Sequence, residues 1–173
     1  MSAAAAALDK LLIRLTDADR EQMRRHAPVH LVDQYDAAAA EVDQLIAGIG
    51  RDLDANPGWV EYGNVPQWLR LALVDTWHGF TTGRIDTCQH SPVIDRPEPV
   101  VAAVWRPNLI VCAHCAYLTR AVGAADRQCD KCSRVCAGLP HDGIHPCSIT
   151  FGPLLYFYGL CRRCMAEHTE ATS

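Results

Sequence analysis

The feature that most constrains this chain is the position of its cysteines. All nine lie between Cys88 and Cys164, and residues 1–85 contain none. Six of them form three C-x-x-C pairs: Cys112/Cys115, Cys129/Cys132 and Cys161/Cys164. Two intervening residues allow a tight turn to direct both sulfurs at one tetrahedral ion. One such pair is a weak signal, but three close together predict metal binding and argue against ordinary buried thiols.

A fourth ligand pair is needed to complete two four-ligand sites. The best candidate is Cys88-Gln89-His90, although its C-x-H spacing is shorter than is usual for zinc ligands. Pairing by proximity along the chain predicts two zinc ions, the first held by Cys88, His90, Cys112 and Cys115 and the second by Cys129, Cys132, Cys161 and Cys164. A β-hairpin is predicted between the two ligand pairs of each site.

Two other pairings fit the spacing. The C-x2-C-x13-C-x2-C run from Cys112 to Cys132 would form a zinc ribbon and would leave the first and last pairs to share the other ion. A cross-braced arrangement like that of RING domains would join the first pair to the third and the second to the fourth. Sequential pairing is favoured because each ion then closes its own hairpin.

The expected compartment supports metal over disulfides. The N-terminal residues lack the basic and apolar regions of a signal peptide, and no apolar run approaches the ~20 residues of a membrane helix. We therefore expect a cytoplasmic protein with reduced thiols and no membrane contact. The composition, rich in arginine and alanine and poor in lysine, is typical of a bacterial source. Zinc is favoured over an iron–sulfur cluster because ferredoxin-type cysteine runs are absent.

The cysteine-free part, residues 1–84, is predicted to be a small helical bundle. Helices are expected over Ser2–Leu15, Thr16–His26, Pro28 to Ile49, and Asn64 to Phe80. Thr16 and Asp19 resemble a capping box that opens the second helix. Asn56-Pro57-Gly58 marks a turn before the fourth helix.

The third predicted helix carries a heptad-like apolar seam. Its members are Leu31, Tyr35, Ala38, Val42, Leu45 and Ile49. Because the pattern covers fewer than three heptads, packing against the same chain is favoured. A homodimer through Leu31–Ile49 is the alternative.

Residues 85–173 are predicted to form a second domain with two zinc modules, at about 85–118 and 126–170. Short β-type runs occur at Val100–Trp105, at Leu109–Val111, and at Ile149 with Leu154–Tyr158. Small sheets of this size bury too little surface to be stable alone, so a metal is expected to hold them. The predicted fold class is therefore α+β, a helical bundle followed by two small zinc-stabilised β-hairpin or treble-clef-like modules.

The second module resembles a treble-clef zinc finger. In that class a knuckle and a hairpin are followed by a helix whose first turn supplies the last two ligands. The corresponding segments are the knuckle Cys129-Asp130-Lys131-Cys132, the hairpin Ile149–Leu160 and a helix beginning at Cys161. Thiolates at a helix N-terminus are favoured by its free N–H groups and its dipole. The first module looks like a related unit without a clear helix.

The remaining cysteines and histidines near the predicted sites are Cys136, Cys147, His114, His141, His145 and His168. The two thiols are expected to pack inside the second module, and the histidines to lie on loops. Alternatively, Cys136, His141, His145 or Cys147 substitutes for a ligand, the two thiols form a redox pair, or a Cys/His dyad acts as a nucleophile.

Three functions compete. The leading hypothesis is a non-catalytic interaction module that binds a macromolecule, most simply a protein, because four protein ligands per ion leave no open position for a substrate. The second is nucleic-acid binding through a basic face with Tyr117 or Tyr156 for stacking, although the net charge of −4 is unfavourable. That face would comprise Arg120, Arg127, Lys131, Arg134, Arg162 and Arg163. The third is a hydrolase or redox enzyme using Asp75, His78 and the spare thiols.

Overall fold

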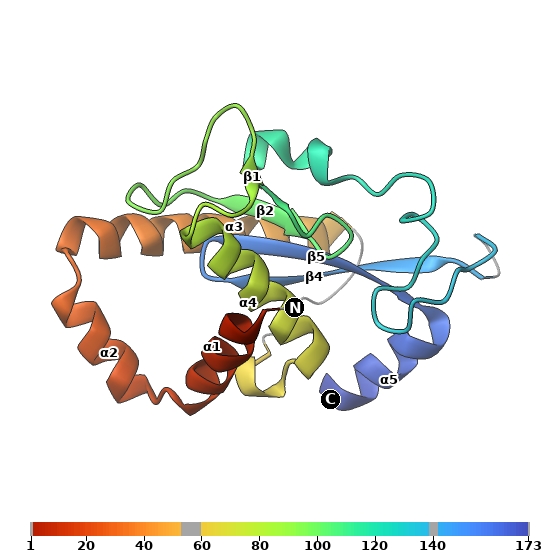
Figure 1. The fold of residues 1–173 in the computed structure, drawn as a ribbon, viewed down its shortest axis with the longest axis horizontal. Coiled ribbons are helices and arrows are strands. Elements are labelled where there is room, and N and C mark those ends of the chain that lie inside the picture. The colour runs from red at the N-terminus through yellow and green to blue at the C-terminus, as the bar shows by residue number, and fades with distance from the viewer. Residues whose placement is uncertain (1, 53–59, 139–141, 173) are drawn as a thin grey trace.

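The computed structural model describes residues 2–52, 60–138 and 142–172 as a mixed α+β fold (Figure 1). The helices are α1 (Ala3–Arg14), α2 (Asp17–His26), α3 (Val29–Asp52), α4 (Gln67–Thr81) and α5 (Arg162–Thr172), with the 3-10 segments η1 (Tyr62–Asn64) and η2 (Ala113–Thr119). The strands are β1 (Asp86–Thr87), β2 (Val100–Ala103), β3 (Leu109–Cys112), β4 (Ile144–Phe151) and β5 (Leu154–Cys161). The predicted α+β class is confirmed. The predicted turn Asn56-Pro57-Gly58 lies outside the described residues, and no described helix is long and apolar enough to cross a membrane.

Local sequence signals set the helix starts. Ser2 caps α1 by accepting a hydrogen bond from the N–H of Ala5. Thr16 and Asp19 form the predicted capping box at α2, in which each side chain accepts a hydrogen bond from the other residue's backbone N–H. The first two helices therefore begin within one or two residues of the predicted positions.

All five strands form one sheet in the order β1-β3-β2-β5-β4. Two antiparallel hairpins, β2–β3 and β4–β5, occur where the sequence predicts them. They are joined by parallel pairing of β2 with β5, in which Val100 lies opposite Leu154. The sequence predicts separate small modules, whereas the strands of both modules share a sheet.

Alternate residues along the central strands face opposite layers of helices. On β2, Val100 and Ala102 belong to one buried cluster with Leu69 of α4, and Val101 belongs to a second cluster with Val42 of α3. Figure 1 shows α1 and α4 in front of the sheet and α3 behind it. The described helices therefore do not form the predicted bundle, because the sheet separates α3 from α1 and α4.

The apolar seam of α3 packs in part against the sheet. Ala38 and Val42 are buried, as packing within the chain predicts, whereas Leu45 is 41% exposed. The side chain of Ile49 lies outside the described residues. Dimerisation through this helix remains a prediction.

The first buried cluster contains residues from both sides of the predicted boundary at residue 84. Ala5, Leu69 and Leu73 pack with Val100 and Tyr156. The hydrophobic core therefore continues across residue 84, although the cysteine content changes there. Independent folding of residues 1–84 remains a prediction.

A buried ionic network joins α1 to α4. The Asp9 carboxylate is 3% exposed and accepts hydrogen bonds from Nε of Arg70 at 2.8 Å and from the Tyr62 hydroxyl at 2.9 Å. A second Arg70 donor bonds to the carbonyl of Val65 at 2.6 Å. Burial, followed by the hydrogen bond to Asp9, raises the pKa of Tyr62. The carboxylate and guanidinium are thus withdrawn from water together, each with hydrogen-bond partners.

The β4–β5 turn requires glycine at Gly152. Its φ is +56°, and an added Cβ would lie 1.9 Å from the hydroxyl oxygen of Tyr35 on α3. Gly152→Ala should lose ~1–2 kcal/mol of unfolding free energy to backbone strain and a further ~1–3 kcal/mol to overpacking. Gly123→Ala is the matched control, because Gly123 has a φ of +63° with nothing within 4 Å of an added Cβ. Equal losses for both variants in denaturant unfolding would contradict the predicted contact with α3.

Candidate metal centres

The first group of candidate ligands lies at the β1–β3 edge of the sheet. Cys88 follows β1, whose parallel pairing places Thr87 beside Ile110 of β3. Cys112 is the last residue of β3, and Cys115 lies in η2. The ligand atoms of these three cysteines and His90 all lie within 4.8 Å of one another. Three are buried, and His90 is exposed.

The distances in this group suit a tetrahedral ion. Sγ of Cys88 lies 3.7 Å from Sγ of Cys112, and Nδ1 of His90 lies 3.3 Å from the sulfurs of both Cys112 and Cys115. A tetrahedron with ordinary Zn–S and Zn–N bonds has S···S separations of ~3.8 Å and S···N separations of ~3.6 Å. The four residues therefore fit one zinc-sized ion with a shift of a few tenths of an ångström.

The second group lies at the end of β5. Cys129 and Cys132 come from a loop, here called the knuckle loop (Cys129–Cys132), while Cys161 ends β5 and Cys164 lies in the first turn of α5. All four sulfurs are within 4.8 Å of one another, and only Cys132 is exposed. The separation of 3.8 Å between the sulfurs of Cys132 and Cys161 is the value that a tetrahedral zinc thiolate site requires.

Backbone hydrogen bonds hold the knuckle loop in place. The N–H of Ser133 donates to the carbonyl of Cys129 at 2.8 Å, and Ser133 has the left-handed φ of 60° that closes the turn. Asp130 pairs with Gly159 of β5 twice, donating its N–H to the carbonyl at 2.9 Å and accepting the N–H through its carboxylate at 2.6 Å. The loop is thereby attached to the strand that carries Cys161.

Backbone donors lower the pKa of one thiol in each group. Burial raises the pKa of Cys129, but the N–H groups of Cys161, Cys132 and Lys131 point at its sulfur and together lower it to about 7. At Cys88 burial is likewise outweighed by backbone donors, and the pKa falls. A lowered pKa favours the thiolate, which is the form that binds metal.

Burial and crowding raise the pKa of one thiol in each group. Burial, followed by the sulfurs of Cys112 and Cys88, raises the pKa of Cys115 to about 11. Burial and its three neighbouring thiols raise the pKa of Cys164 in the same way. Four thiolates cannot accumulate this closely without a cation to compensate their charge, so the arrangement suits a divalent ion.

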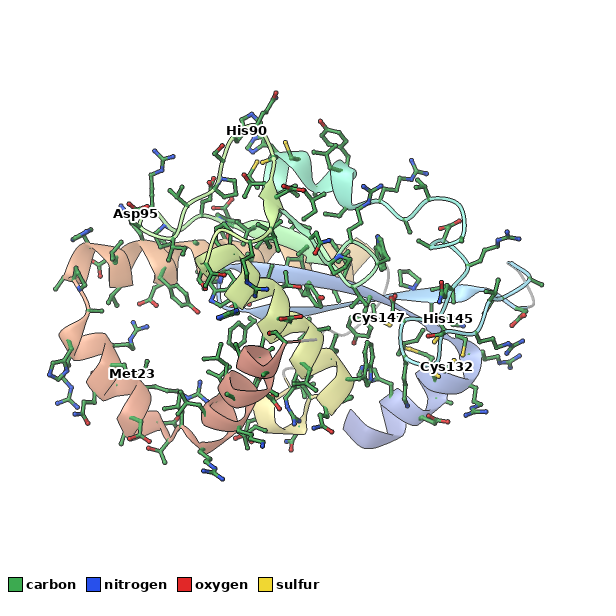
Figure 2. All side chains as sticks on the ribbon, in the orientation of Figure 1. Met23, His90, Asp95, Cys132, His145 and Cys147 are labelled. Atoms are coloured by element: carbon green, nitrogen blue, oxygen red, sulfur yellow. The ribbon has the colours of Figure 1, made fainter. Side chains whose placement is uncertain are left out.

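The structure groups the eight residues as sequential pairing predicts (Figure 2). Sulfur atoms gather beside His90 and, separately, beside Cys132. Cys112 lies opposite Val100, which lies opposite Leu154 at the start of β5, whereas Cys161 ends that strand. Seven residues of strand correspond to ~23 Å. The ribbon and cross-braced pairings would need ligands from both groups around one ion, which this separation excludes.

The spare thiols lie outside both groups. Cys136 is buried in the core, and its N–H donates to the carbonyl of Arg127 at 2.8 Å. Cys147 contacts Sδ of Met165 at 3.7 Å, and burial raises its pKa to about 11. Among the described residues neither thiol belongs to a ligand group. Their packing agrees with the prediction of structural cysteines.

The candidate histidines are also outside the described ligand groups apart from His90. His114 and His145 are exposed, and His168 lies 3.0 Å from the hydroxyl of Tyr158. His141 lies outside the described residues. No substitute ligand is therefore identified among the described histidines.

The candidate pair Asp75 and His78 is held by a third residue. Nδ1 of His78 accepts a hydrogen bond from Arg84 at 2.7 Å, and Asp75 accepts one from Ser2 at 2.7 Å. Arg84 also lies 4.0 Å from Asp75. These contacts join the end of α4 to the N-terminus and give a structural account of the pair.

The spacing of the cysteines is the sequence signal for both centres. His90 is predicted only because a fourth ligand pair is needed to complete the first site. No known protein family, curated protein or solved structure matches the chain. The chemistry of the two centres therefore rests on the eight residues themselves and on their geometry.

Proposed function

We propose that this chain is a structural zinc protein that binds two zinc ions and acts as a non-catalytic interaction module. The observation that carries the proposal is that each group supplies four protein ligand atoms within 4.8 Å of one another. Four protein ligands complete the tetrahedral shell of zinc and leave no position for a substrate or a reactive water. The ions would stabilise the fold.

The ligand sets favour zinc over other metals. One group offers three sulfurs and one imidazole nitrogen, and the other offers four sulfurs. Soft thiolates in tetrahedral geometry suit zinc or an iron–sulfur cluster. Zinc is supported by the S···S separations of 3.7 and 3.8 Å, which match a single central ion.

The order of elements supports a treble-clef classification for the second module. The knuckle loop precedes the β4–β5 hairpin, and α5 follows directly with Cys164 in its first turn. The helix begins at Arg162, one residue after the predicted start at Cys161. Both the free N–H groups of that first turn and the helix dipole favour a thiolate there.

A protein partner is favoured by what the surface near the metal centres offers. Three apolar side chains in the segment that follows Cys115 are more than half exposed, namely Tyr117, Val122 and Val135. Exposed apolar groups on a rigid, metal-held scaffold suit a protein interface. This surface is the proposed contact region.

The basic face proposed for nucleic acid is weakened by internal ion pairs. Lys131 and Arg163 both pair with Glu167, and Arg134 pairs with Asp142. Tyr156, one of the two residues considered for stacking, is only 1% exposed and is therefore unavailable. Binding of labelled RNA or DNA at low salt that weakens steeply with added salt would favour this alternative.

Single ligand substitutions should remove the zinc ions one at a time. Cys112→Ser should leave about one zinc per chain, lost from the first centre, because three remaining ligands hold the ion far more weakly. Cys132→Ser should also leave one, lost from the second. The double variant should hold none. Mass spectrometry of the metal content under native conditions measures all three, and loss of both ions from either single variant would contradict two independent centres.

A further inference from the structure

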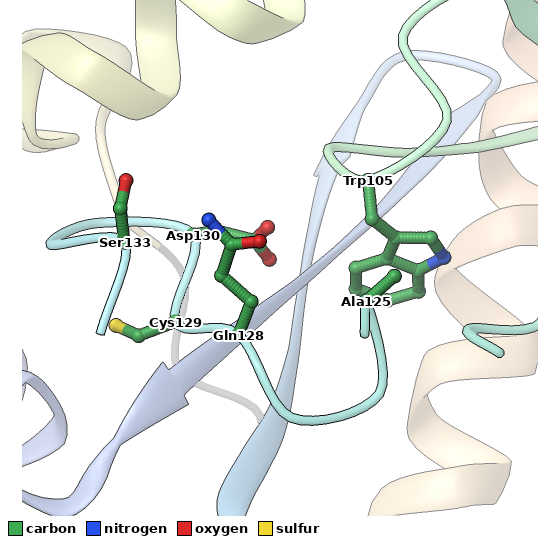
Figure 3. A pocket seen from close by; sticks show the side chains of 6 residues that line it. All are labelled: Trp105, Ala125, Gln128, Cys129, Asp130 and Ser133. Carbon is green, nitrogen blue, oxygen red and sulfur yellow. The ribbon is translucent and has the colours of Figure 1, made fainter. Parts of the chain in front are cut away.

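A pocket lies beside the second metal centre, between the knuckle loop and the turn after β2. It is lined by Trp105, Ala125, Gln128, Cys129, Asp130 and Ser133 (Figure 3). In Figure 3 the sulfur of Cys129 points away from Trp105 and Gln128, and it belongs to the second ligand group. Of the lining residues only Cys129 is a candidate metal ligand, and the side chains of Trp105 and Gln128 have no part in the metal centre.

One wall of the pocket is a fixed aromatic ring. The indole Nε1 of Trp105 donates a hydrogen bond to the carbonyl of Thr119 at 2.6 Å, on the side away from the pocket. This bond ties the β2–β3 turn to the end of η2 and sets the orientation of the ring. The six-membered ring of Trp105 is left facing Gln128 and Asp130 across the pocket (Figure 3).

The opposite wall is polar and carries a charge. Oδ2 of Asp130 is held by the N–H of Gly159 at 2.6 Å, whereas Oδ1 makes no hydrogen bond within the described residues. Asp130 is half-buried. Gln128 lines the same pocket (Figure 3). The wall therefore offers a carboxylate held in place by Gly159 and the side-chain amide of Gln128, which is exposed.

The surroundings of the pocket are electronegative. Four thiolates around one divalent ion carry a net charge of about −2, and the chain has a formal net charge of −4. Of the nearby cations, Lys131 pairs with Glu167 and Arg134 with Asp142, whereas the exposed Arg127, next to Gln128, makes no ion pair among the described residues. The metal centre and Asp130 would attract a bound cation, and Arg127 would oppose it in part.

We infer that this pocket binds a guanidinium group, presented by an arginine side chain of a protein partner. A planar guanidinium stacks on an indole ring and donates to a carboxylate and an amide oxygen at its edge. An ammonium group is a compact point charge and uses the flat ring and the two acceptors less well. The inference rests on the proposed function as an interaction module and names the chemistry of its partner.

The test is a titration of the zinc-loaded full-length chain, labelled with 15N, with N-acetyl-argininamide. The indole N–H of Trp105 and the backbone N–H of Gly159 should shift together and saturate. N-acetyl-citrullinamide has the same shape without the charge. Its affinity should be lower by a factor of about ten or more, because a charge-assisted contact is lost. Because this comparison uses the unmodified protein, it does not depend on the folding of a variant.

Asp130→Asn provides the second arm. An asparagine oxygen still accepts the Gly159 bond, but the charge is gone, so the affinity for N-acetyl-argininamide should fall about tenfold. Asp126→Asn is the matched control, because Asp126 lies on the same loop, is exposed and does not line the pocket. Its affinity should equal that of the unmodified chain.

The zinc content of every sample is measured before the titration, so that the two proposals fail separately. A sample without zinc would contradict the proposed function. For samples that hold two zinc ions, any of three results would contradict guanidinium binding in the pocket. These are no shift at Trp105, equal affinity for the citrulline compound, and equal affinity of the two aspartate variants for N-acetyl-argininamide. Binding of free arginine but not of the blocked form would also contradict a peptide side chain as the ligand.

Discussion

Replacing Cys161 by serine is expected to release one zinc ion and to unfold the part of the sheet around it. Structural zinc sites contribute on the order of 10 kcal/mol to folding, comparable with the whole stability of a domain of this size. Cys161 is 1% exposed and ends β5, a strand hydrogen-bonded to β2 on one side and β4 on the other. Amide exchange should therefore show loss of protection in β4, β5 and α5.

The first metal centre should survive this substitution, because Cys112 lies at the other end of the sheet from Cys161. Cys136→Ser is the control, since Cys136 is equally buried and lies outside both ligand groups. That variant should keep two zinc ions and lose only ~1–3 kcal/mol from burying a hydroxyl. A Cys161→Ser protein that keeps both ions, or a Cys136→Ser protein that loses one, would mean that the ligands of the second centre are wrongly assigned.

Asp9→Ala is expected to destabilise the chain by ~3–5 kcal/mol, because it leaves a guanidinium in the core without its counter-charge. The Arg70 side chain is only 11% exposed, and its Nε would lose the Asp9 oxygen at 2.8 Å. The Tyr62 hydroxyl would lose its acceptor as well. Urea unfolding followed by circular dichroism measures the change in the free energy of unfolding.

An exposed ion pair in the same chain is the control for this effect. Arg24 and Asp36 join α2 to α3, with about half of each side chain in contact with water. Asp36→Ala should therefore cost no more than ~1 kcal/mol. Similar losses for Asp9→Ala and Asp36→Ala would show that the Asp9 network is not buried as described. The zinc content should stay unchanged in both.

The features that the sequence predicts well are those encoded by neighbouring residues. The C-x-x-C pairs specify tight turns, and Thr16 with Asp19 specifies a helix start, so each was recognisable from a few positions. The β2–β3 and β4–β5 hairpins are also local, because the paired strands follow one another along the chain. The grouping of the ligands needs further contacts, since β1 pairs with β3 to bring Cys88 to Cys112, and Asp130 bonds to Gly159 to attach the knuckle loop to β5.

The features that the sequence does not predict depend on contacts between distant segments. Parallel pairing of Val100 with Leu154 has no local signal, because both strands are short apolar runs that fit several partners. Nor does any local signal show that α3 and α4 pack on opposite faces of the shared sheet, which is why the predicted helical bundle is wrong. Asp9, Tyr62 and Arg70 come from three separate elements. Their spacing along the chain gives no indication that they meet.

X-ray absorption at the zinc edge of the purified chain, combined with its metal content, tests the two-centre account most directly. The account predicts close to two zinc ions per chain. Each ion should have four ligands, and the two ions together should have seven sulfur ligands and one nitrogen ligand, as the two groups supply. The zinc–sulfur distance should be ~2.3 Å, with no ordered oxygen ligand. A content near one zinc, iron in place of zinc, or an average shell containing oxygen would contradict two closed structural zinc centres.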